Sequence, residues 1–217
     1  GRDHIAGLVN NIEGQSRVEN VSFKGQIKSK GGNSVTAGIA GTNAMSLVKR
    51  AYVEADIWVK SGQNAGMLVA QNFTDYSGSG WGNWGKLMQS VAKGKLEDAG
   101  SRNAAGIAAS IWPYGTINDT VSYATVVNGK ELFSSDNEIT DAWMGQKLQN
   151  LFGVQGHSSG TKTGKDAKFR RLTEAEAEQK VKSYRITALE QSSANEVTTE
   201  KLNAAILRTS TYQDKPG

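Results

Sequence analysis

Few residues in this chain have the chemistry to bind a metal or attack a substrate. The chain holds two histidines, His4 and His157, and no cysteine. No His-Glu-x-x-His pattern is present, so the paired helix histidines that many zinc proteases use are missing. We therefore predict no metal site and no catalytic residue here. A zinc site built from one histidine and scattered carboxylates is the alternative.

His157 lies in the polar segment Gly156-His157-Ser158-Ser159-Gly160. A serine nucleophile needs a histidine close in space and an acid that orients that histidine. Adjacency in sequence supplies neither of them. The segment therefore predicts a loop histidine.

Two carboxylates, Glu54 and Asp56, alternate along a short apolar-polar stretch that is typical of a strand. Alternation places both on the same face of a sheet. Paired carboxylates that hydrolyse glycosides lie about 5 to 9 Å apart, which a sequence does not show. We expect outward-facing, solubilising acids, and a polysaccharide lyase or hydrolase stays the alternative.

A glycine-rich aromatic insertion, residues 76–85, has neither helix nor strand periodicity and predicts a loop. Tyr and Trp bring large, rigid contact area at a low cost in conformational entropy. Tyr76, Trp81 and Trp84 are therefore our first candidates for binding a partner. The alternative is that the two Trp side chains fold back onto the body of the protein.

A second candidate surface is a run of basic side chains in and after a polar, glycine-containing stretch. Its members are Lys162, Lys165, Lys168, Arg170 and Arg171. Such a run binds an anionic partner or forms a solvated surface.

The elements that must position these residues come from a repeated phrase. Ala6-Gly7, Ala37-Gly38, Ala65-Gly66 and Ala105-Gly106 each precede two apolar residues. A second set of phrases follows them, in which Val21-Ser22-Phe23, Ala51-Tyr52-Val53, Val91-Ala92-Lys93 and Val121-Ser122-Tyr123 align. Repeats of this length with short apolar runs and Gly/Asn turns predict a solenoid. We expect a mainly β fold, a right-handed parallel β-helix of about four coils over residues 1–130, and an antiparallel sandwich is the alternative.

Glycine becomes less frequent after about residue 130, and sequence patterns typical of helices follow. We therefore assign residues 131–217 to a helical cap and a linker. The spacing of Trp143, Met144, Leu148, Leu151 and Phe152 predicts a helix that begins near Thr140 or Asp141 and ends at Gly153.

Three further elements are expected beyond this helix. Thr173 and Glu176 form a capping box that predicts a helix to about Lys182. Residues 184–189 are expected to be extended. Thr198 or Thr199 is expected to begin a last helix.

Composition sets the remaining limits. The net charge is +4, too weak to predict nucleic-acid binding. No apolar run approaches the roughly 18 residues that span a bilayer, so we expect no membrane insertion. The chain begins at Gly1 and ends at Gly217, and we interpret it as a fragment of a longer protein.

The repeat phrases, together with Val18-Glu19-Asn20-Val21 and Ile117-Asn118-Asp119-Thr120-Val121, resemble the non-catalytic repeat region of the Gram-positive immunoglobulin A protease family. The segment from Leu151 to Gly160 and Val181-Lys182-Ser183-Tyr184 are similar to the region that follows those repeats. These are large cell-surface zinc metalloproteases, whose zinc ligands lie on a later His-Glu-x-x-His helix that this chain lacks.

The resemblance implies a non-catalytic module of a secreted, cell wall-attached zinc metalloprotease. It implies no cofactor in this chain, because zinc belongs to the absent catalytic domain. The implied partners are the immunoglobulin A heavy chain and the neighbouring protease domain. An independent adhesin or glycan-binding surface module is the alternative, and a purely structural spacer is another.

Overall fold

The computed structural model describes residues 4–32, 35–73, 85–111, 115–130, 148–157 and 169–189. The chain divides into two compact units, Gly1–Ile186 and Thr187–Gly217. Only residues 187–189 of the second unit are described, so the following concerns the first unit. The predicted boundary near residue 130 stays a prediction.

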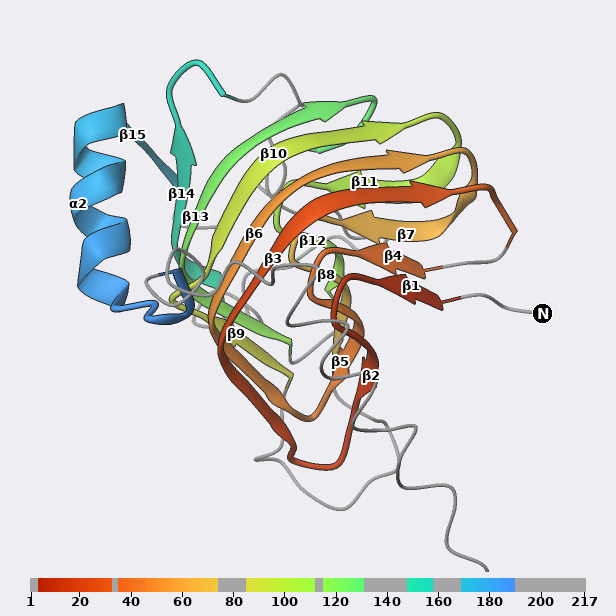
Figure 1. Cartoon of the computed structure of the whole chain (residues 1–217), viewed down its shortest axis with the longest axis horizontal. Helices are drawn as coiled ribbons and strands as arrows, with labels where there is room; N and C mark the ends of the chain where they lie inside the picture. Colours follow the sequence, from red (N-terminus) through yellow and green to blue (C-terminus); the bar gives the residue numbers. More distant parts are fainter. Residues whose placement is uncertain are drawn as a thin grey trace, which may run out of the picture. The chain divides into compact units, whose positions relative to one another are not determined.

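The first unit is built mainly from three parallel β-sheets (Figure 1). The first sheet contains β1 (His4–Ala6), β4 (Val35–Ala37), β7 (Gly62–Gly66) and β11 (Ser101–Ala105). The second contains β2 (Val9–Ile12), β5 (Ala40–Ala44), β8 (Val69–Phe73) and β12 (Ala108–Ile111). The third, which we call the long sheet, contains β3 (Arg17–Ser29), β6 (Leu47–Val59), β9 (Lys86–Met88), β10 (Val91–Asp98), β13 (Thr116–Val127), β14 (Leu148–Val154) and β15 (Phe169–Leu172).

Successive repeats place their strands side by side. In the long sheet β3 pairs with β6, β6 with β10, and β10 with β13, all in parallel. The first two sheets follow the same order of repeats. A mainly β fold with parallel sheets is thus confirmed. The antiparallel sandwich is wrong, because every strand pairing within the described ranges is parallel.

Apolar side chains from neighbouring repeats stack inside the sheets. Ile27 pairs with Ile57, Ile57 with Leu96, and Leu96 with Val126. All four are buried, as the stacking of one repeat on the next requires. The core between these strands therefore consists of short columns of stacked apolar side chains. A single repeat could not bury these side chains alone.

One residue in each repeat of the long sheet adopts a left-handed backbone conformation. Asn20, Arg50, Gln89, Asp119 and Asn150 have φ between 48° and 55°. The pairing register places these five at the same level, for example Asn20 opposite Arg50 between the pairs Glu19–Lys49 and Val21–Ala51. Each of these residues adds one position to the alternation of inward and outward side chains. The spacing between successive inward side chains therefore changes from two residues to three at this corner, as at a β-bulge.

The register corrects both predicted alignments by one residue, the first at the third repeat and the second at the third and fourth repeats. Gly66 pairs with Ala37 and Ala105, so it occupies the alanine position of the phrase. Val91 pairs with Tyr52, so Lys93 lies opposite Glu54 and not opposite Val53. A shift of one residue moves a side chain to the other face of a sheet. Lys93 therefore lies in one row with Glu54 and Tyr123, and it is exposed.

The helix predicted to end at Gly153 is wrong where the structure describes it, because Leu148–Val154 is strand β14. Leu148, Leu151 and Phe152 have helix-like spacing since the left-handed Asn150 interrupts the alternation between them. Trp143 and Met144 lie outside the described residues, as do Thr198 and Thr199.

The capping-box helix is confirmed. α2 spans Glu174–Tyr184, and the Thr173 side chain accepts a hydrogen bond from the Glu176 amide while Glu176 accepts one from the Thr173 amide. The extended segment predicted from Tyr184 is wrong at its first residue, which is the last of α2, and at residues 188–189, which are helical.

Helix α2 flanks the long sheet beside β14 and β15 (Figure 1). Ala177 and Tyr184 are its buried residues. The Tyr184 hydroxyl donates to Asp119 Oδ1 at 3.1 Å, and Lys180 Nζ lies 2.7 Å from the same oxygen. Lys180 also lies 4.8 Å from the ring centroid of Phe152, a cation–π distance. Asp119, one of the left-handed corner residues, thus anchors the helix.

Within the described ranges no helix is long and apolar enough to cross a membrane.

Candidate functional site

The outer face of the long sheet carries rows of polar side chains that cross the strands. One row contains Lys24, Glu54, Lys93 and Tyr123, which the register places opposite one another on β3, β6, β10 and β13. The next outward row contains Gln26, Asp56, Lys95 and Thr125. Since outward side chains on a strand are two residues apart, the two rows run parallel about 7 Å apart.

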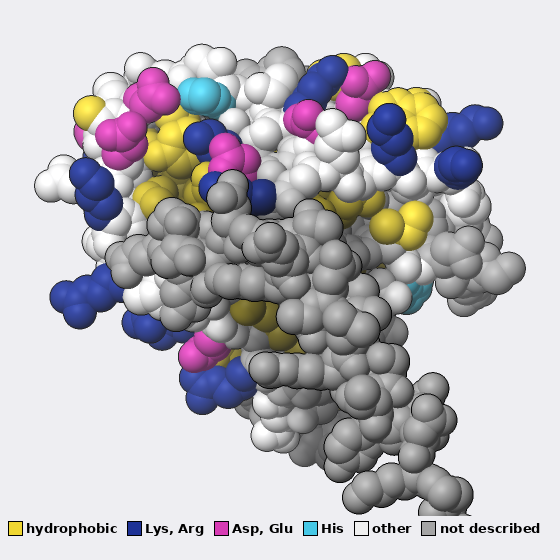
Figure 2. Space-filling model, viewed as in Figure 1, with side chains coloured by type: hydrophobic (Ala, Val, Ile, Leu, Met, Phe, Trp, Pro, Cys, Tyr) yellow, Lys and Arg dark blue, Asp and Glu magenta, His cyan; other side chains and the backbone are white. Residues whose placement is uncertain are grey.

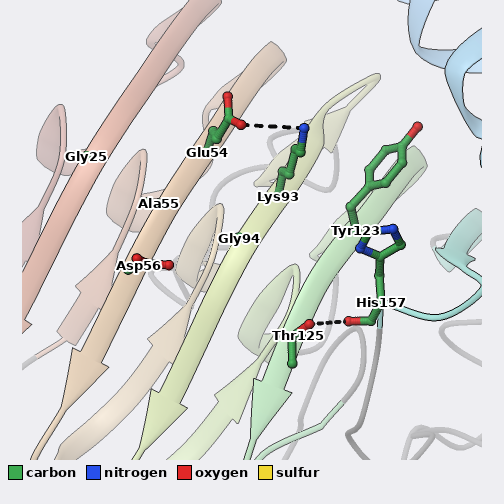
Figure 3. A pocket seen from close by; sticks show the side chains of 9 residues that line it. All are labelled: Gly25, Glu54, Ala55, Asp56, Lys93, Gly94, Tyr123, Thr125 and His157. Carbon is green, nitrogen blue, oxygen red and sulfur yellow. Dashed lines mark hydrogen bonds and ion pairs between the residues drawn. The ribbon is translucent and has the colours of Figure 1, made fainter.

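A hollow of about 350 Å³ lies between these rows, and we call it the outer groove. Gly25, Ala55 and Gly94 line it between the two outward rows (Figure 3). Gly94 has φ of 110°, and a Cβ added there would collide with the backbone of Ala55. This position therefore requires glycine.

Glu54 is held at the edge of the groove by three partners. Lys24 Nζ lies 3.2 Å from Oε2, Lys93 Nζ lies 3.4 Å from Oε1, and the Tyr52 hydroxyl donates to Oε2 at 3.1 Å. Burial acts to raise the pKa of Glu54, but the hydrogen bonds from Lys24 and Tyr52 and the charge of Lys93 outweigh it, so the pKa lies below its ordinary value. Glu54 is therefore an ionised, paired carboxylate.

His157 closes one end of the outer groove from the turn that follows β14 (Figure 3). The Thr125 hydroxyl donates to the His157 carbonyl oxygen at 2.7 Å. The imidazole contacts the Tyr123 ring edge-on, with centroids 5.6 Å apart. His157 Nε2 also lies 3.8 Å from Glu174 Oε1 on α2's first turn. Burial, followed by the charges of Glu178 and Glu174, raises the pKa of Tyr123 to about 12.

A second hollow of about 210 Å³ continues along the same face and shares Asp56 with the outer groove. It is lined by Gln26, Lys28, Asp56, Ile57, Trp58, Lys95 and Glu97. Lys95 Nζ and Glu97 Oε2 form an ion pair at 2.7 Å. Figure 2 shows basic, acidic and hydrophobic side chains gathered over the region where β3, β6 and β10 run, at the upper right of the view.

The aromatic loop lies outside the described residues, and so do its three candidate residues Tyr76, Trp81 and Trp84. Both ends of the gap are fixed, however. The Asn72 side chain donates to the Gly85 carbonyl oxygen at 3.1 Å and also accepts a hydrogen bond from Asn43.

Of the basic run, Lys162, Lys165 and Lys168 lie outside the described residues. Arg170 and Arg171 lie on β15. Arg170 Nη2 is 3.6 Å from Glu176, and Arg171 donates to the Val154 carbonyl oxygen at 3.4 Å. Both arginines therefore have partners within the chain.

Among the residues that the structure describes, no group of three His, Asp or Glu side chains could hold a metal ion. His4 Nδ1 lies 3.0 Å from the Asn11 side-chain oxygen on the surface. Asp56 shares the outer groove with Glu54, whose carboxylate is already paired with two lysines.

Apart from Glu54, Asp56 and His157, the polar residues that line the outer groove were not singled out from the sequence. Lys93, Tyr123 and Thr125 come from β10 and β13, and Lys24, which pairs with Glu54 at the edge of the groove, comes from β3. The signal available was the alternation of Lys24, Glu54 and Lys93 along one row, which is apparent only once the strands are paired.

The chain is similar to part of the zinc metalloprotease ZmpB from Streptococcus pneumoniae serotype 4. The two are 38% identical over 221 aligned positions, which cover 87% of this chain and 11% of the metalloprotease. The match confirms the predicted resemblance to the Gram-positive immunoglobulin A protease family, and it confines that resemblance to a small part of the longer protein. No family model and no solved structure matches the chain.

Proposed function

We propose that this chain is a non-catalytic module of a secreted, cell wall-attached zinc metalloprotease, and that it holds a protein partner on the outer face of its long sheet. The partner is the immunoglobulin A heavy chain, with the neighbouring protease domain completing the complex. The zinc belongs to that domain. Retaining a large substrate near the protease raises the effective concentration of its scissile segment.

The observation that carries this proposal is the outer groove. It lies on a parallel sheet, and its charges are fixed by the pairs that Glu54 makes with Lys24 and Lys93. Pre-positioned charges and aromatic edges favour binding because little conformational entropy is lost when a partner docks. Similarity to a segment covering 11% of a zinc metalloprotease supports a module within such a protein.

The proposal also includes the way in which the repeats are wound. The repeats form a right-handed parallel β-helix of about four coils, in which each coil adds one strand to each sheet. The column of Ile27, Ile57, Leu96 and Val126 supports it, as does the ladder of left-handed corner residues. Such a solenoid presents an extended, regular face to a partner.

The aromatic loop and the basic run contribute further contacts in this proposal. Tyr76, Trp81 and Trp84 supply aromatic anchors in this proposal. The run from Lys162 to Arg171 supplies positive charge, which steers encounter and depends on salt.

Calorimetric titration of the chain with intact immunoglobulin A tests the proposal. We expect saturable binding. Lys93→Glu should weaken it at least about tenfold, because the charge reversal removes the ion pair between Lys93 and Glu54. The Trp81/Trp84 double alanine variant is expected to weaken binding as well. Gln63→Ala, an exposed change on β7 of the first sheet, is the matched control and should leave binding unchanged.

Two outcomes would overturn the proposal. One is the absence of saturable binding to immunoglobulin A by the folded chain. The other is binding that neither the groove variant nor the loop variant changes, since the contact surface would then lie elsewhere.

A further inference from the structure

Trp58 lies in an unusual place for a tryptophan. It belongs to β6, where its neighbours Ile57 and Val59 are buried in the core, and alternation turns its indole to the outer face. There it is only partly buried and lines the second hollow. The core does not use it, and the part of the indole that stays exposed lies on a polar face.

The side chains around the indole are polar and arranged in order. Lys28 and Glu97 lie opposite Trp58 on the two neighbouring strands, β3 and β10. Gln26, Asp56 and Lys95 form the adjacent row, one outward position away. Each strand pair fixes these spacings, and the Lys95–Glu97 ion pair at 2.7 Å holds two of the side chains in place.

The charges of this hollow balance. Lys28 and Lys95 carry two positive charges, and Asp56 and Glu97 carry two negative charges. A polyanion such as a nucleic acid or a highly acidic polysaccharide gains nothing from a site of zero net charge. Its polar groups instead offer both hydrogen-bond donors and acceptors, since an amide and an ammonium donate while carboxylates accept.

A flat apolar platform bordered by donors and acceptors fits one chemical class well. A pyranose ring has an apolar face of C–H groups and an edge of hydroxyls, each of which both donates and accepts. The face can cover the indole, while the hydroxyls reach Gln26, Asp56 and Lys95. The hollow, at about 210 Å³, holds about the volume of seven liquid waters.

We infer that the hollow at Trp58 is a binding site for a neutral oligosaccharide. Through Asp56 it continues into the outer groove, so a chain of more than one ring can extend along the face. The site goes beyond the proposed function, because it recognises sugar whether the carrier is an immunoglobulin, another glycoprotein or a free glycan.

NMR titration of the ¹⁵N-labelled chain with free neutral oligosaccharides tests the inference without any protein partner. The probes are N-acetyllactosamine, chitotriose, maltotriose and mannotriose, with 3′-sialyllactose as the anionic comparison. The indole N–H signal of Trp58, identified by its absence from the Trp58→Phe spectrum, reports on the site. We expect saturable shifts of this signal with at least one neutral probe, with a dissociation constant of about 1 mM or lower.

Three variants make the result specific. Trp58→Ala should weaken binding about tenfold, the loss expected when roughly 60 Å² of apolar contact disappears. Trp58→Phe keeps an aromatic ring and should weaken it less, and it serves as the second variant should the alanine change perturb folding. Gln63→Ala, on another sheet, should leave binding unchanged.

The inference is overturned if no neutral probe shifts the Trp58 indole, if Trp58→Ala binds as tightly as the parent chain, or if 3′-sialyllactose binds more tightly than every neutral probe. Because the titration contains no immunoglobulin, its failure leaves the proposed protein-binding function untouched. Failure of the immunoglobulin titration likewise leaves this result unaffected.

Discussion

The contact between Tyr184 and Asp119 provides a quantitative test of how helix α2 is attached. Tyr184 is 1% exposed, and its hydroxyl donates to Asp119 Oδ1 at 3.1 Å. Tyr184→Phe removes this hydrogen bond and keeps the ring, so the packing of the helix should be unchanged. The effect on stability therefore measures the hydrogen bond alone.

The expected magnitude follows from the surroundings of Asp119. A hydrogen bond to a charged group contributes about 1.5 to 3 kcal/mol. Asp119 keeps its ion pair with Lys180 in the variant, and its side chain is 23% exposed, so water can partly replace the lost donor. We expect a loss of about 1 to 2 kcal/mol in the free energy of unfolding, which lowers Tm by roughly 2–4 °C per kcal/mol for a unit of this size.

Chemical denaturation and calorimetry measure this loss, and a double-mutant cycle with Asp119→Gly isolates it. Glycine suits the left-handed backbone of position 119, where φ is 53°, so that change removes the accepting carboxylate without adding backbone strain. Ser183→Ala, an exposed change whose hydroxyl bonds only within the helix, is the control and should change stability by less than about 0.5 kcal/mol. Unchanged stability in Tyr184→Phe, or no coupling in the cycle, would refute the anchoring of α2 through Asp119.

Three other predictions concern the sheets and the helix cap. Thr173→Ala removes the capping box and should lower the free energy of unfolding by about 1 kcal/mol, with the largest loss of hydrogen-exchange protection in the first turn of α2. Gly38→Ala should destabilise the fold by about 1–3 kcal/mol in urea denaturation, because its Cβ would meet the Met67 carbonyl oxygen and the Val53 side chain; a neutral result would contradict the close approach of these repeats. In the folded chain the pKa values of Glu54 and Glu176 lie below the ordinary value of 4.5. The two ionised carboxylates therefore stabilise the fold above that pH, and this contribution is lost as the pH falls through the folded-state pKa values. Glu54→Gln should reduce this acid-dependent part of the unfolding free energy, and an unchanged pH profile would show that the lysine pairs do not act on stability.

The repeat phrases predicted the parallel β architecture because the buried columns repeat in the sequence. Residues such as Ile57 and Leu96 recur at the same point in each repeat, and their apolar character is visible without coordinates. The capping box at Thr173 was equally visible, since its two hydrogen bonds depend on local spacing alone.

The helix predicted to end at Gly153 was wrong because of a left-handed corner residue. Asn150 separates Leu148 from Leu151 by three positions, which imitates the spacing of a helix face. Asn and Asp favour the left-handed conformation and occupy three of the five corner positions, but Arg50 and Gln89 occupy the other two, so residue type alone does not mark the corners. The one-residue slip in the predicted alignments is apparent only from the strand pairing.

The outer groove could not be predicted for a related reason. It is assembled from side chains on neighbouring strands, and their arrangement depends on the register to a single residue. Glu54 and Asp56 were recognised as neighbours on one strand, but their partners Lys24 and Lys93 become apparent only when the strands are paired.

Hydrogen–deuterium exchange of the chain, free and bound to immunoglobulin A, tests the central claim most directly. Protein binding slows exchange where the interface excludes water or stabilises the backbone against local opening. We expect added protection in β6, β10 and β13 and in the turn at His157, with little change in β7 and β11 of the first sheet. Protection confined to the first or second sheet, or none at saturating partner, would contradict the assignment of the outer face as the binding surface.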